Sequence, residues 1–416
     1  MPVPAQDGVV TPGTMPDDII AYLYNLEKRH LVWDALRPWF EAQGYILYPN
    51  RYPGKLSEVF KYDLSEEHTD VPSVHVGDKS LRARMRSMIF IPPALFSAVS
   101  RQHQDVMIKV LSTEGDETDI LKHLMSEPQC SDPLNTTIPI LDVLTFDDRY
   151  SFLVMPRSVN RANSPFTMLI QVRWGPTDPL LDTGFDCLGT AFEYALCLLK
   201  ALAFLHKNLI VHRDIRPGNV LVNFYAPGQA NYQCFFASKH TKFALCDFGC
   251  STMFPSDILP ADRVCPAADS ECGTFEYHPP DVAEGATVYD PFAYDVACMG
   301  GLLCEVIGYM TPLAPPLAPF LDRMITPDLC TRYTAAEALD ALLQLKDSLD
   351  PKCFDTPAPA PPSFPQCVWQ AYDRWAGLPV DFLKEHSARL PPVRPRRKIA
   401  LVDGTSYFVD WDSPEL

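Results

Sequence analysis

The chain has 416 residues, 47% of them hydrophobic, and carries a net charge of −17. A chain of this length and composition has room for one large or two modest domains with a sizeable core. The excess of acidic residues argues against a nucleic-acid partner, because contacts with phosphates need clustered Lys and Arg side chains.

The N-terminal part is predicted to be an extension, residues 1–84, that contains a single helix. Residues 1–16 are rich in Pro, Gly and Asp, a composition typical of disordered segments. From residue 17 to residue 43 apolar side chains recur near helical spacing, and Gly44 is the predicted stop. The aromatic segment 44–54 that follows is expected to be extended.

Two strand-like segments come next, Met88–Ile91 and Asp105–Leu111. Lys109 lies inside the second segment, and a buried lysine is costly unless its charge is paired. Glu117, at the start of a predicted helix, is the preferred partner of Lys109, and Glu114 is the alternative. An edge strand with Lys109 at the surface is the other interpretation.

Further strands are expected at 142–148 and 151–155, followed by an amphipathic helix over 185–206. The stretch after that helix, residues 211–222, reads V-H-R-D-I-R-P-G-N-V-L-V. In the pattern H-R-D-x-x-x-x-N the Asp can accept a proton from a substrate hydroxyl, and the Asn reaches a Mg²⁺ ion beside a nucleoside triphosphate. Asp214 and Asn219 have this spacing.

Two more motifs follow in the order that this chemistry requires. Residues 245–249 form a short apolar run that ends in Asp-Phe-Gly, where Asp247 would hold Mg²⁺ and the glycine allows a sharp turn. Residues 273–281, G-T-F-E-Y-H-P-P-D, resemble the end of a protein-kinase activation segment. On these motifs, residues 85–349 resemble a eukaryotic protein-kinase-like domain. The N-terminal helix with the segment 44–54 resembles, more specifically, the kinase-like proteins of mushroom-forming fungi.

The resemblance implies an α+β fold with a small β-rich N-terminal lobe and a larger, mainly helical C-terminal lobe. It also implies ATP and Mg²⁺ as cofactors. The implied catalytic residues are Asp214, which would orient and deprotonate the acceptor hydroxyl, with Arg216, Asn219 and Lys109. The implied nucleotide-binding residues are Lys109, Glu117, Met155, Leu221 and Asp247, and the implied metal ligands are Asn219 and Asp247.

Supporting roles follow from the same resemblance. Asp295, at the start of a long helix, is expected to accept hydrogen bonds from the catalytic-loop backbone, and Arg332 is expected to pair with Asp281. Thr274 and Pro217 favour Ser and Thr hydroxyls as acceptors. Arg213 is expected to read an activating phosphate in the segment after Asp-Phe-Gly. The candidate acceptors of that phosphate are Ser251, Thr252, Ser256 and Ser270.

Two departures from the kinase pattern leave three functions open. No glycine occurs from residue 81 to residue 105, so no G-x-G-x-x-G loop precedes Lys109 there. Met107 stands where kinases have a small alanine beside the adenine. We favour an ATP-dependent protein kinase that acts on Ser and Thr of an unknown protein substrate. A pseudokinase that serves as a binding or scaffolding module is the alternative, and a small-molecule kinase of the aminoglycoside or choline type is third.

The C-terminal region is predicted to be a Pro-rich linker, residues 350–366, and a tail, residues 367–416. Residues 398–402 and 406–411 of the tail are predicted to form a β-hairpin around Asp403-Gly404. The basic run 394–398 is interpreted as a solvated strand start, with a nuclear-import signal as the alternative.

Cysteine usage and hydropathy bear on the cellular compartment. The 13 cysteines show no zinc-type spacing, so reduced thiols and a cytoplasmic location are expected, with the nucleus as the alternative. The N-terminus lacks a signal-peptide pattern. No run of uncharged apolar residues has the length of a membrane span, so no membrane partner is expected. Nothing in the sequence predicts the oligomeric state.

Overall fold

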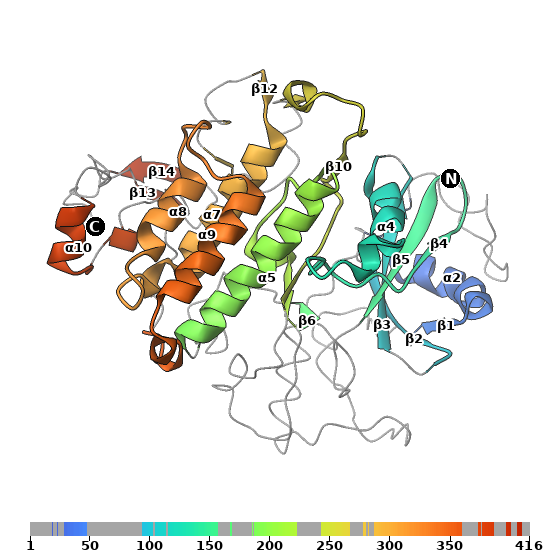
Figure 1. The fold of residues 1–416 in the computed structure, drawn as a ribbon. Helices are drawn as coiled ribbons and strands as arrows, with labels where there is room; N and C mark the ends of the chain where they lie inside the picture. The colour runs from blue at the N-terminus through green and yellow to red at the C-terminus, as the bar shows by residue number, and fades with distance from the viewer. Residues whose placement is uncertain are drawn as a thin grey trace, which may run out of the picture.

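The computed structural model places its residues in two lobes, one built on a β-sheet and a larger one built mainly from helices (Figure 1). This arrangement confirms the predicted fold class. The described residues are 19, 23, 29–47, 94–102, 105–113, 115–156, 167–168, 185, 187–222, 243–266, 278–279, 282, 287–359, 373–375, 377–386, 397–400 and 406–409.

The smaller lobe contains an antiparallel sheet with the strand order β1-β2-β3-β5-β4. Its strands are β1 (Tyr45–Leu47), β2 (Leu95–Ser100), β3 (Asp105–Ser112), β4 (Asp142–Thr145) and β5 (Tyr150–Pro156). Because successive side chains of a strand point to opposite faces, Ile108 and Val110 of β3 lie on one face and Lys109 and Leu111 on the other. The two faces are covered by different helices.

Helix α2 (Arg29–Gln43) covers the face that carries Ile108. Its Trp33 ring stacks on Phe96 of β2 at 4.9 Å, and its Phe40 meets Phe152 of β5 edge to face at 4.8 Å. The helix ends at Gly44, whose φ of +95° suits glycine, and the chain passes directly into β1. Of the residues before the kinase-like region, those of α2 cover the sheet and those of β1 form its edge strand.

Helix α4 (Glu117–Met125) lies against the opposite face. Its Ile120 and Leu121 are fully buried among Leu111 of β3, Leu153 of β5 and Phe248 of the other lobe. The helix begins at the residue that the sequence assigns as the partner of Lys109. One apolar cluster thus joins the sheet, α4 and the loop after Leu245.

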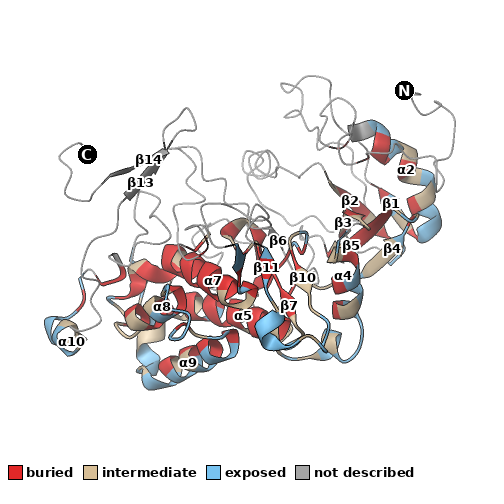
Figure 2. Ribbon diagram, turned by 90° about the horizontal axis from the view of Figure 1, so that it is seen from above, coloured by how far each residue is buried: buried red, intermediate tan, exposed pale blue. Residues whose placement is uncertain are grey.

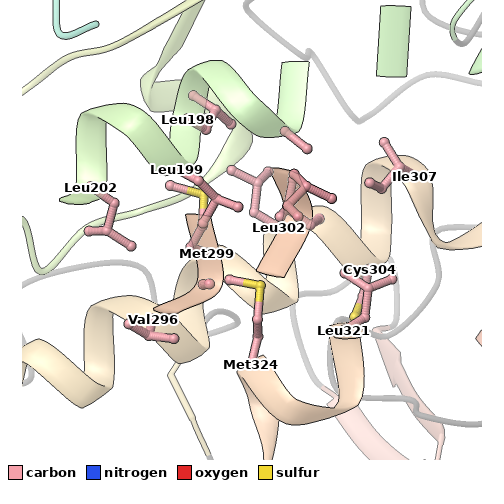
Figure 3. Close-up of a cluster of buried hydrophobic side chains, with 14 of the residues drawn as sticks. Leu198, Leu199, Leu202, Val296, Met299, Leu302, Cys304, Ile307, Leu321 and Met324 are labelled. Atoms are coloured by element: carbon pink, nitrogen blue, oxygen red, sulfur yellow. The ribbon is translucent and has the colours of Figure 1, made fainter. Parts of the chain in front are cut away.

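The larger lobe is built around two apolar helices, α5 (Leu188–Lys207) and α7 (Pro291–Ile307), with α8 (Leu317–Ile325) and α9 (Ala335–Ser348) packed beside them. Leu199, Met299 and Leu302 meet at the centre of this core (Figure 3). By length and composition alone, Leu188–Lys207 and Pro291–Met310 are apolar enough to span a membrane, but both are mostly buried inside the lobe (Figure 2). Apolar residues around the whole helix are typical of such core helices.

Short paired strands connect loops that are distant in the sequence. They are β6 (Thr167–Met168), β8 (Val220–Val222) and β9 (Phe243–Leu245) in one sheet, β7 (Ile210–Val211) with β10 (Thr252–Met253), and β11 (Cys265–Pro266) with β12 (Val288–Tyr289). The pairing of β7 with β10 fixes the chain after Asp-Phe-Gly next to the chain that enters the catalytic loop. These pairings bring together segments that are far apart in the sequence.

The C-terminal region differs from a plain linker and tail. The 3-10 turn η9 (Pro351–Asp355) packs on α5, where Phe354 meets Phe192 edge to face. The turn η10 (Asp373–Trp375) and helix α10 (Val380–Glu385) return to the helical lobe. Strands β13 (Arg397–Ala400) and β14 (Ser406–Val409) pair antiparallel, where the sequence predicts a hairpin.

The observed strands bear on where a phosphate-covering loop before Lys109 would lie. The predicted strand 88–91 lies outside the described residues, and β2, at residues 95–100, was not predicted. β1 and β2 are neighbours in the sheet, and residues 48–94 lie between them in the sequence. Apart from Ala94, this connection is not described, and its sequence contains Gly54 and Gly77. The interval 81–105 therefore covers only part of it.

We expect α2 to be essential for the stability of the smaller lobe. Trp33 is 1% exposed, so Trp33→Ala removes a fully buried ring and should lower the free energy of unfolding by ~3–5 kcal/mol. Urea unfolding measures this loss. Leu31→Ala on the same helix is the control, because Leu31 is 45% exposed. A loss no larger than that of the control would show that α2 does not belong to the lobe's core.

Candidate active site

A buried carboxylate holds the loop 212–219 in place. Asp295 of α7 is fully buried and accepts hydrogen bonds from the backbone N–H groups of His212, at 2.6 Å, and Arg213, at 2.7 Å. His206 of α5 donates to the same carboxylate through Nε2 at 3.1 Å. Arg213 has a φ of +66°, a strained backbone conformation that persists only where surrounding contacts enforce it. The contact expected for Asp295 is therefore present.

The side chains of Asp214, Arg216 and Asn219 form one hydrogen-bonded group. Asn219 donates through Nδ2 to Asp214 Oδ2 at 2.7 Å and to the Asp214 carbonyl at 2.8 Å. Arg216 Nε donates to the same Oδ2 at 3.1 Å. Asp214 is half-buried and Arg216 is 37% exposed, so a charged pair sits at the rim of a buried loop. These contacts fix the orientation of the Asp214 carboxylate.

Lys109 joins the sheet, α4 and the loop after β9. Its Nζ lies 2.6 Å from Glu117 Oε1 and 2.7 Å from Asp247 Oδ1. The structure thus pairs Lys109 with Glu117, and Glu114 lies outside the described residues. Asp247 has a φ of +71°, so its backbone is also held in the left-handed region. Three charged groups from three separate elements meet at this point.

The charges of this cluster shift one another's pKa. Burial raises the pKa of Glu117 above its usual value, and the Lys109 ammonium opposes that rise only in part. Burial likewise acts to raise the pKa of Asp247, but Lys109 outweighs it, so the pKa of Asp247 lies below its usual value. Burial acts to lower the pKa of Lys109, and Asp247 and Glu117 together raise it above its usual value. The ammonium is charged throughout the physiological range.

The Asp214 group and the Lys109 cluster are linked through the segment that contains Cys246 and Asp247. Cys246, which directly precedes Asp247, donates its backbone N–H to the Asn219 carbonyl at 3.0 Å. Burial and the charge of Asp247 raise the pKa of the Cys246 thiol, while Lys109 and Arg216 act in the opposite direction. The pKa of this thiol therefore depends on charges of both the Lys109 cluster and the Asp214 group. The structure brings together the residues that the sequence assigns to phosphate transfer.

The residues expected beside the nucleotide lie on the facing strands. Met155 is at the end of β5 and pairs with Met107 of β3, and both are half-buried. Leu221 of β8 is buried in the cluster that contains Leu153 and Phe248. The Met107 side chain also accepts a contact from Ser97 Oγ at 3.9 Å. Two methionines thus border the region where an adenine is expected.

Arg213 contacts the segment after Asp-Phe-Gly. Its Nη1 donates to Thr252 Oγ1 at 3.1 Å, and its Nε donates to the Tyr289 hydroxyl at 3.0 Å. Ser251 is buried and donates to the His212 carbonyl, whereas Ser256 is exposed. Of the described phosphate-acceptor candidates, Thr252 is the one in contact with Arg213. The activating phosphate itself stays a prediction.

Some residues assigned from the sequence lie outside the described part of the chain, and other residues of the site carry no sequence motif. Ser270, Thr274 and Asp281 are not described, so the expected pair of Arg332 with Asp281 stays a prediction. Arg332 donates to the Thr326 and Ala293 carbonyls and so ties α8 to α7. His206, Tyr289 and Asp116 were not singled out, because no motif marks them. Asp116 accepts the Met253 N–H at 3.1 Å, which ties α4 to β10.

Comparison with known proteins agrees with this geometry. A family model described as "Protein kinase domain" matches residues 95–316, slightly more than half of the 416-residue chain. An "Aurora kinase" of Yarrowia lipolytica is 28% identical over 165 residues, which cover 39% of this chain and 37% of that protein. "Cyclin-dependent kinase 20" of Danio rerio is 30% identical over 123 residues, which cover 30% of this chain and 29% of the relative.

"Cyclin-dependent kinase G1" of Arabidopsis thaliana is 30% identical over 118 residues, which cover 28% of this chain. That match spans 15% of the relative, and the other two matches span 37% and 29% of theirs. The chain thus matches well under half the length of each relative. The similarity is thus confined to a region within each of these proteins.

We expect the stability of the Lys109 cluster to depend on pH in a defined direction. Lys109→Met leaves the Glu117 and Asp247 carboxylates together without their cation, which should cost ~3–5 kcal/mol at pH 7. Glu117 already has a raised pKa, and losing Lys109 raises it further. The variant should therefore regain stability relative to wild type as the pH falls from 7 toward 5, because Glu117 takes up a proton.

Urea unfolding at several pH values measures this dependence. Lys207→Met is the matched control, because the Lys207 side chain is 64% exposed and pairs with Asp132 at the surface. Its loss should be less than ~1 kcal/mol. A Lys109→Met penalty that stays constant from pH 7 to pH 5 would contradict the coupling to Glu117.

Proposed function

Since this chain belongs to the protein kinase domain family, we propose that it is an active protein kinase that transfers the γ-phosphate of Mg²⁺-ATP to Ser and Thr hydroxyls of a protein. The observation that carries the proposal is the Lys109 cluster, in which Nζ bridges Glu117 of α4 and Asp247 after β9. A lysine held between two carboxylates across both lobes is placed to receive phosphate oxygens. Phosphoryl transfer depends mainly on such positioning and charge.

The described residues fit a nucleotide with Mg²⁺. Within the described part of the chain, no group of three or more His, Cys, Asp and Glu side chains forms a complete metal cage. Mg²⁺ in kinase sites is commonly held by one or two protein groups together with substrate phosphates. Asp247, whose side chain is 44% exposed, and Asn219 supply such groups. When bound, Mg²⁺-ATP supplies the phosphoryl group, and the metal offsets its negative charge.

The chain's own residues have separate tasks in the proposed reaction. Lys109 holds phosphate oxygens, and Glu117 keeps the ammonium in place. Asp214 accepts the proton of the acceptor hydroxyl. Asn219 and Arg216 donate hydrogen bonds to the Asp214 carboxylate, so its orientation toward the hydroxyl is fixed. Arg216 keeps a cation next to Asp214, with a planar fork of donors in place of a point charge.

The alternative is a pseudokinase that binds partners without phosphate transfer. Met107 favours it, because this side chain lies opposite Met155 on the strands that border the expected adenine site. A long side chain there takes up space that a flat base needs. The intact Lys109 cluster favours the active enzyme, because a scaffold gains nothing from three charges brought together at a cost in desolvation.

Nucleotide binding is the first test, because an active kinase requires it. A ligand at 100 times its dissociation constant adds ~2.7 kcal/mol to stability, so Mg²⁺-ATP should raise the melting temperature of the wild-type protein. Asp247→Asn should lose the Mg²⁺-dependent part of this rise. Thermal shift with ATP, with and without Mg²⁺, measures both effects. Absence of any shift for the folded wild-type protein at millimolar ATP would favour the pseudokinase.

Phosphate transfer needs a separate variant, because binding alone does not show catalysis. Asp214→Asn removes the proton acceptor and should lower kcat by ~10²- to 10⁴-fold while the thermal shift with Mg²⁺-ATP remains. Transfer to a mixture of Ser/Thr peptides is the assay. Asp340→Asn is the matched control, because Asp340 is exposed on α9, away from the site. Equal rates for Asp214→Asn and wild type would exclude Asp214 from catalysis.

A further inference from the structure

The C-terminal segment 373–386 lies on the helical lobe, at the end far from the sheet (Figures 1 and 2). It follows a Pro- and Ala-rich stretch, residues 356–366, and lies beyond the family match, which ends at residue 316. Its turn η10 packs on the 3-10 turn η8 (Gly308–Met310), and its apolar residues pack on α8. Nothing in the proposed kinase chemistry requires this contact.

One carboxylate on α8 anchors the segment. Asp322 Oδ1 accepts a short hydrogen bond from Arg374 Nε, and its Oδ2 accepts one from Trp375 Nε1 at 2.7 Å. Arg374 is 2% exposed and also reaches Cys304 Sγ at 3.6 Å. Burial raises the pKa of the half-buried Asp322 above its usual value, and Arg374 and Trp375 oppose that rise only in part. Both oxygens of Asp322 thus bind neighbouring residues of the segment.

Apolar contacts surround this anchor. Trp375 and Leu378 are each 5% exposed and pack on Ala318, which is fully buried under them. Phe382 and Leu383 of α10 pack against the same cluster, whereas Val380 is exposed. The segment therefore presents the pattern Arg-Trp-x-x-Leu-x-x-x-Phe-Leu to a complementary surface. Buried Trp and Arg side chains are typical of the few residues that contribute most of the binding energy at an interface.

Desolvation offsets much of the attraction within a buried ion pair, so the pair of Arg374 with Asp322 adds little to the net stability of the contact. The segment is also tethered through its own chain, which supplies a high effective concentration without strong affinity. A small anchor on a Pro-rich tether is thus suited to reversible docking. The contacting side chains Arg374, Trp375, Leu378 and Phe382 lie within a single short stretch.

We propose that the end of α7, η8 and α8 form a docking site for a short Arg-Trp-x-x-Leu segment, and that residues 373–386 of this chain occupy it as a detachable latch. Asp322 is the residue that recognises the Arg-Trp pair. When the latch opens, the same surface becomes available to another segment with this pattern. This site is separate from the Lys109 cluster, so its test does not depend on kinase activity.

Cys304 gives a direct readout of docking, because its thiol lies under Arg374 and is 7% exposed. Cys298, on the same helix and 1% exposed, reports opening of the whole lobe, and the exposed Cys330 gives the unhindered rate. Alkylation of the full-length protein, followed residue by residue by mass spectrometry, measures all three. In the variant Arg374→Ala/Trp375→Ala, Cys304 should react at least ~10-fold faster, with the Cys298 rate unchanged.

Two further variants complete this experiment. Lys384→Ala is the matched control within the segment, because the Lys384 side chain is 73% exposed, and it should leave the Cys304 rate unchanged. Leu378→Ala keeps the ion pair and removes one apolar contact, so it should raise the Cys304 rate by a smaller factor. Equal Cys304 rates in wild type and both weakened variants would overturn the latch. A rise at Cys304 matched by an equal rise at Cys298 would overturn it as well.

Binding in trans tests the docking site itself. A fluorescent peptide of residues 371–388 should bind the Arg374→Ala/Trp375→Ala protein, whose site is vacated. The peptide should bind wild type at least ~10-fold more weakly, because the tethered segment competes. Adding Asp322→Ala to the double variant should abolish binding, as should placing the two alanines in the peptide. A folded double variant that does not bind the peptide, or one that binds it equally well without Asp322, would overturn the proposal.

Discussion

The arrangement of the candidate site depends on the buried carboxylate of Asp295. It accepts two consecutive backbone N–H groups at the start of the loop that carries Asp214, while His206 supports it from α5. A charge without solvent is tolerated only when hydrogen bonds satisfy it, and these three donors do so. In return the carboxylate enforces the left-handed backbone at Arg213. The shape of the loop is thus set by the core of the helical lobe.

The helical lobe contacts the sheet lobe through ion pairs and through an apolar cluster. Lys109, in the middle of the sheet, is paired with Glu117 of α4 and with Asp247 of the other lobe. Behind this cluster, Leu121 of α4 and Phe248 share one apolar core. On the opposite face the aromatic side chains of α2 pack on the sheet, so β3, the strand that contains Lys109, is covered on both sides. The position of the ammonium is therefore fixed by packing as well as by charge.

The ends of the chain extend the kinase-like region in different ways. The N-terminal segment contributes the helix α2 and the edge strand β1, which become part of the sheet lobe. After α9, the chain packs on α5 through η9 and then returns to α8 through Arg374 and Trp375. The first is a large apolar contact typical of a core, whereas the second is a smaller cluster of buried residues around one charged anchor. This difference in contact supports the proposal that residues 373–386 are a detachable latch, whereas α2 is a fixed part of its lobe.

The sequence by itself predicted the fold class, a helix that begins at Glu117, a helix over 185–206 and the charged residues of the site, because motif spacing and apolar periodicity are local properties. The long helix expected to start at Asp295 begins earlier, at Pro291. Only the tertiary structure decided that β1 joins the sheet, that the 95–100 segment is a strand, and that Arg374 binds Asp322. These contacts join residues far apart in the chain, and no local pattern records such a pairing. The same reason hid His206 and Tyr289, whose roles exist only once α5, α7 and β12 have packed together.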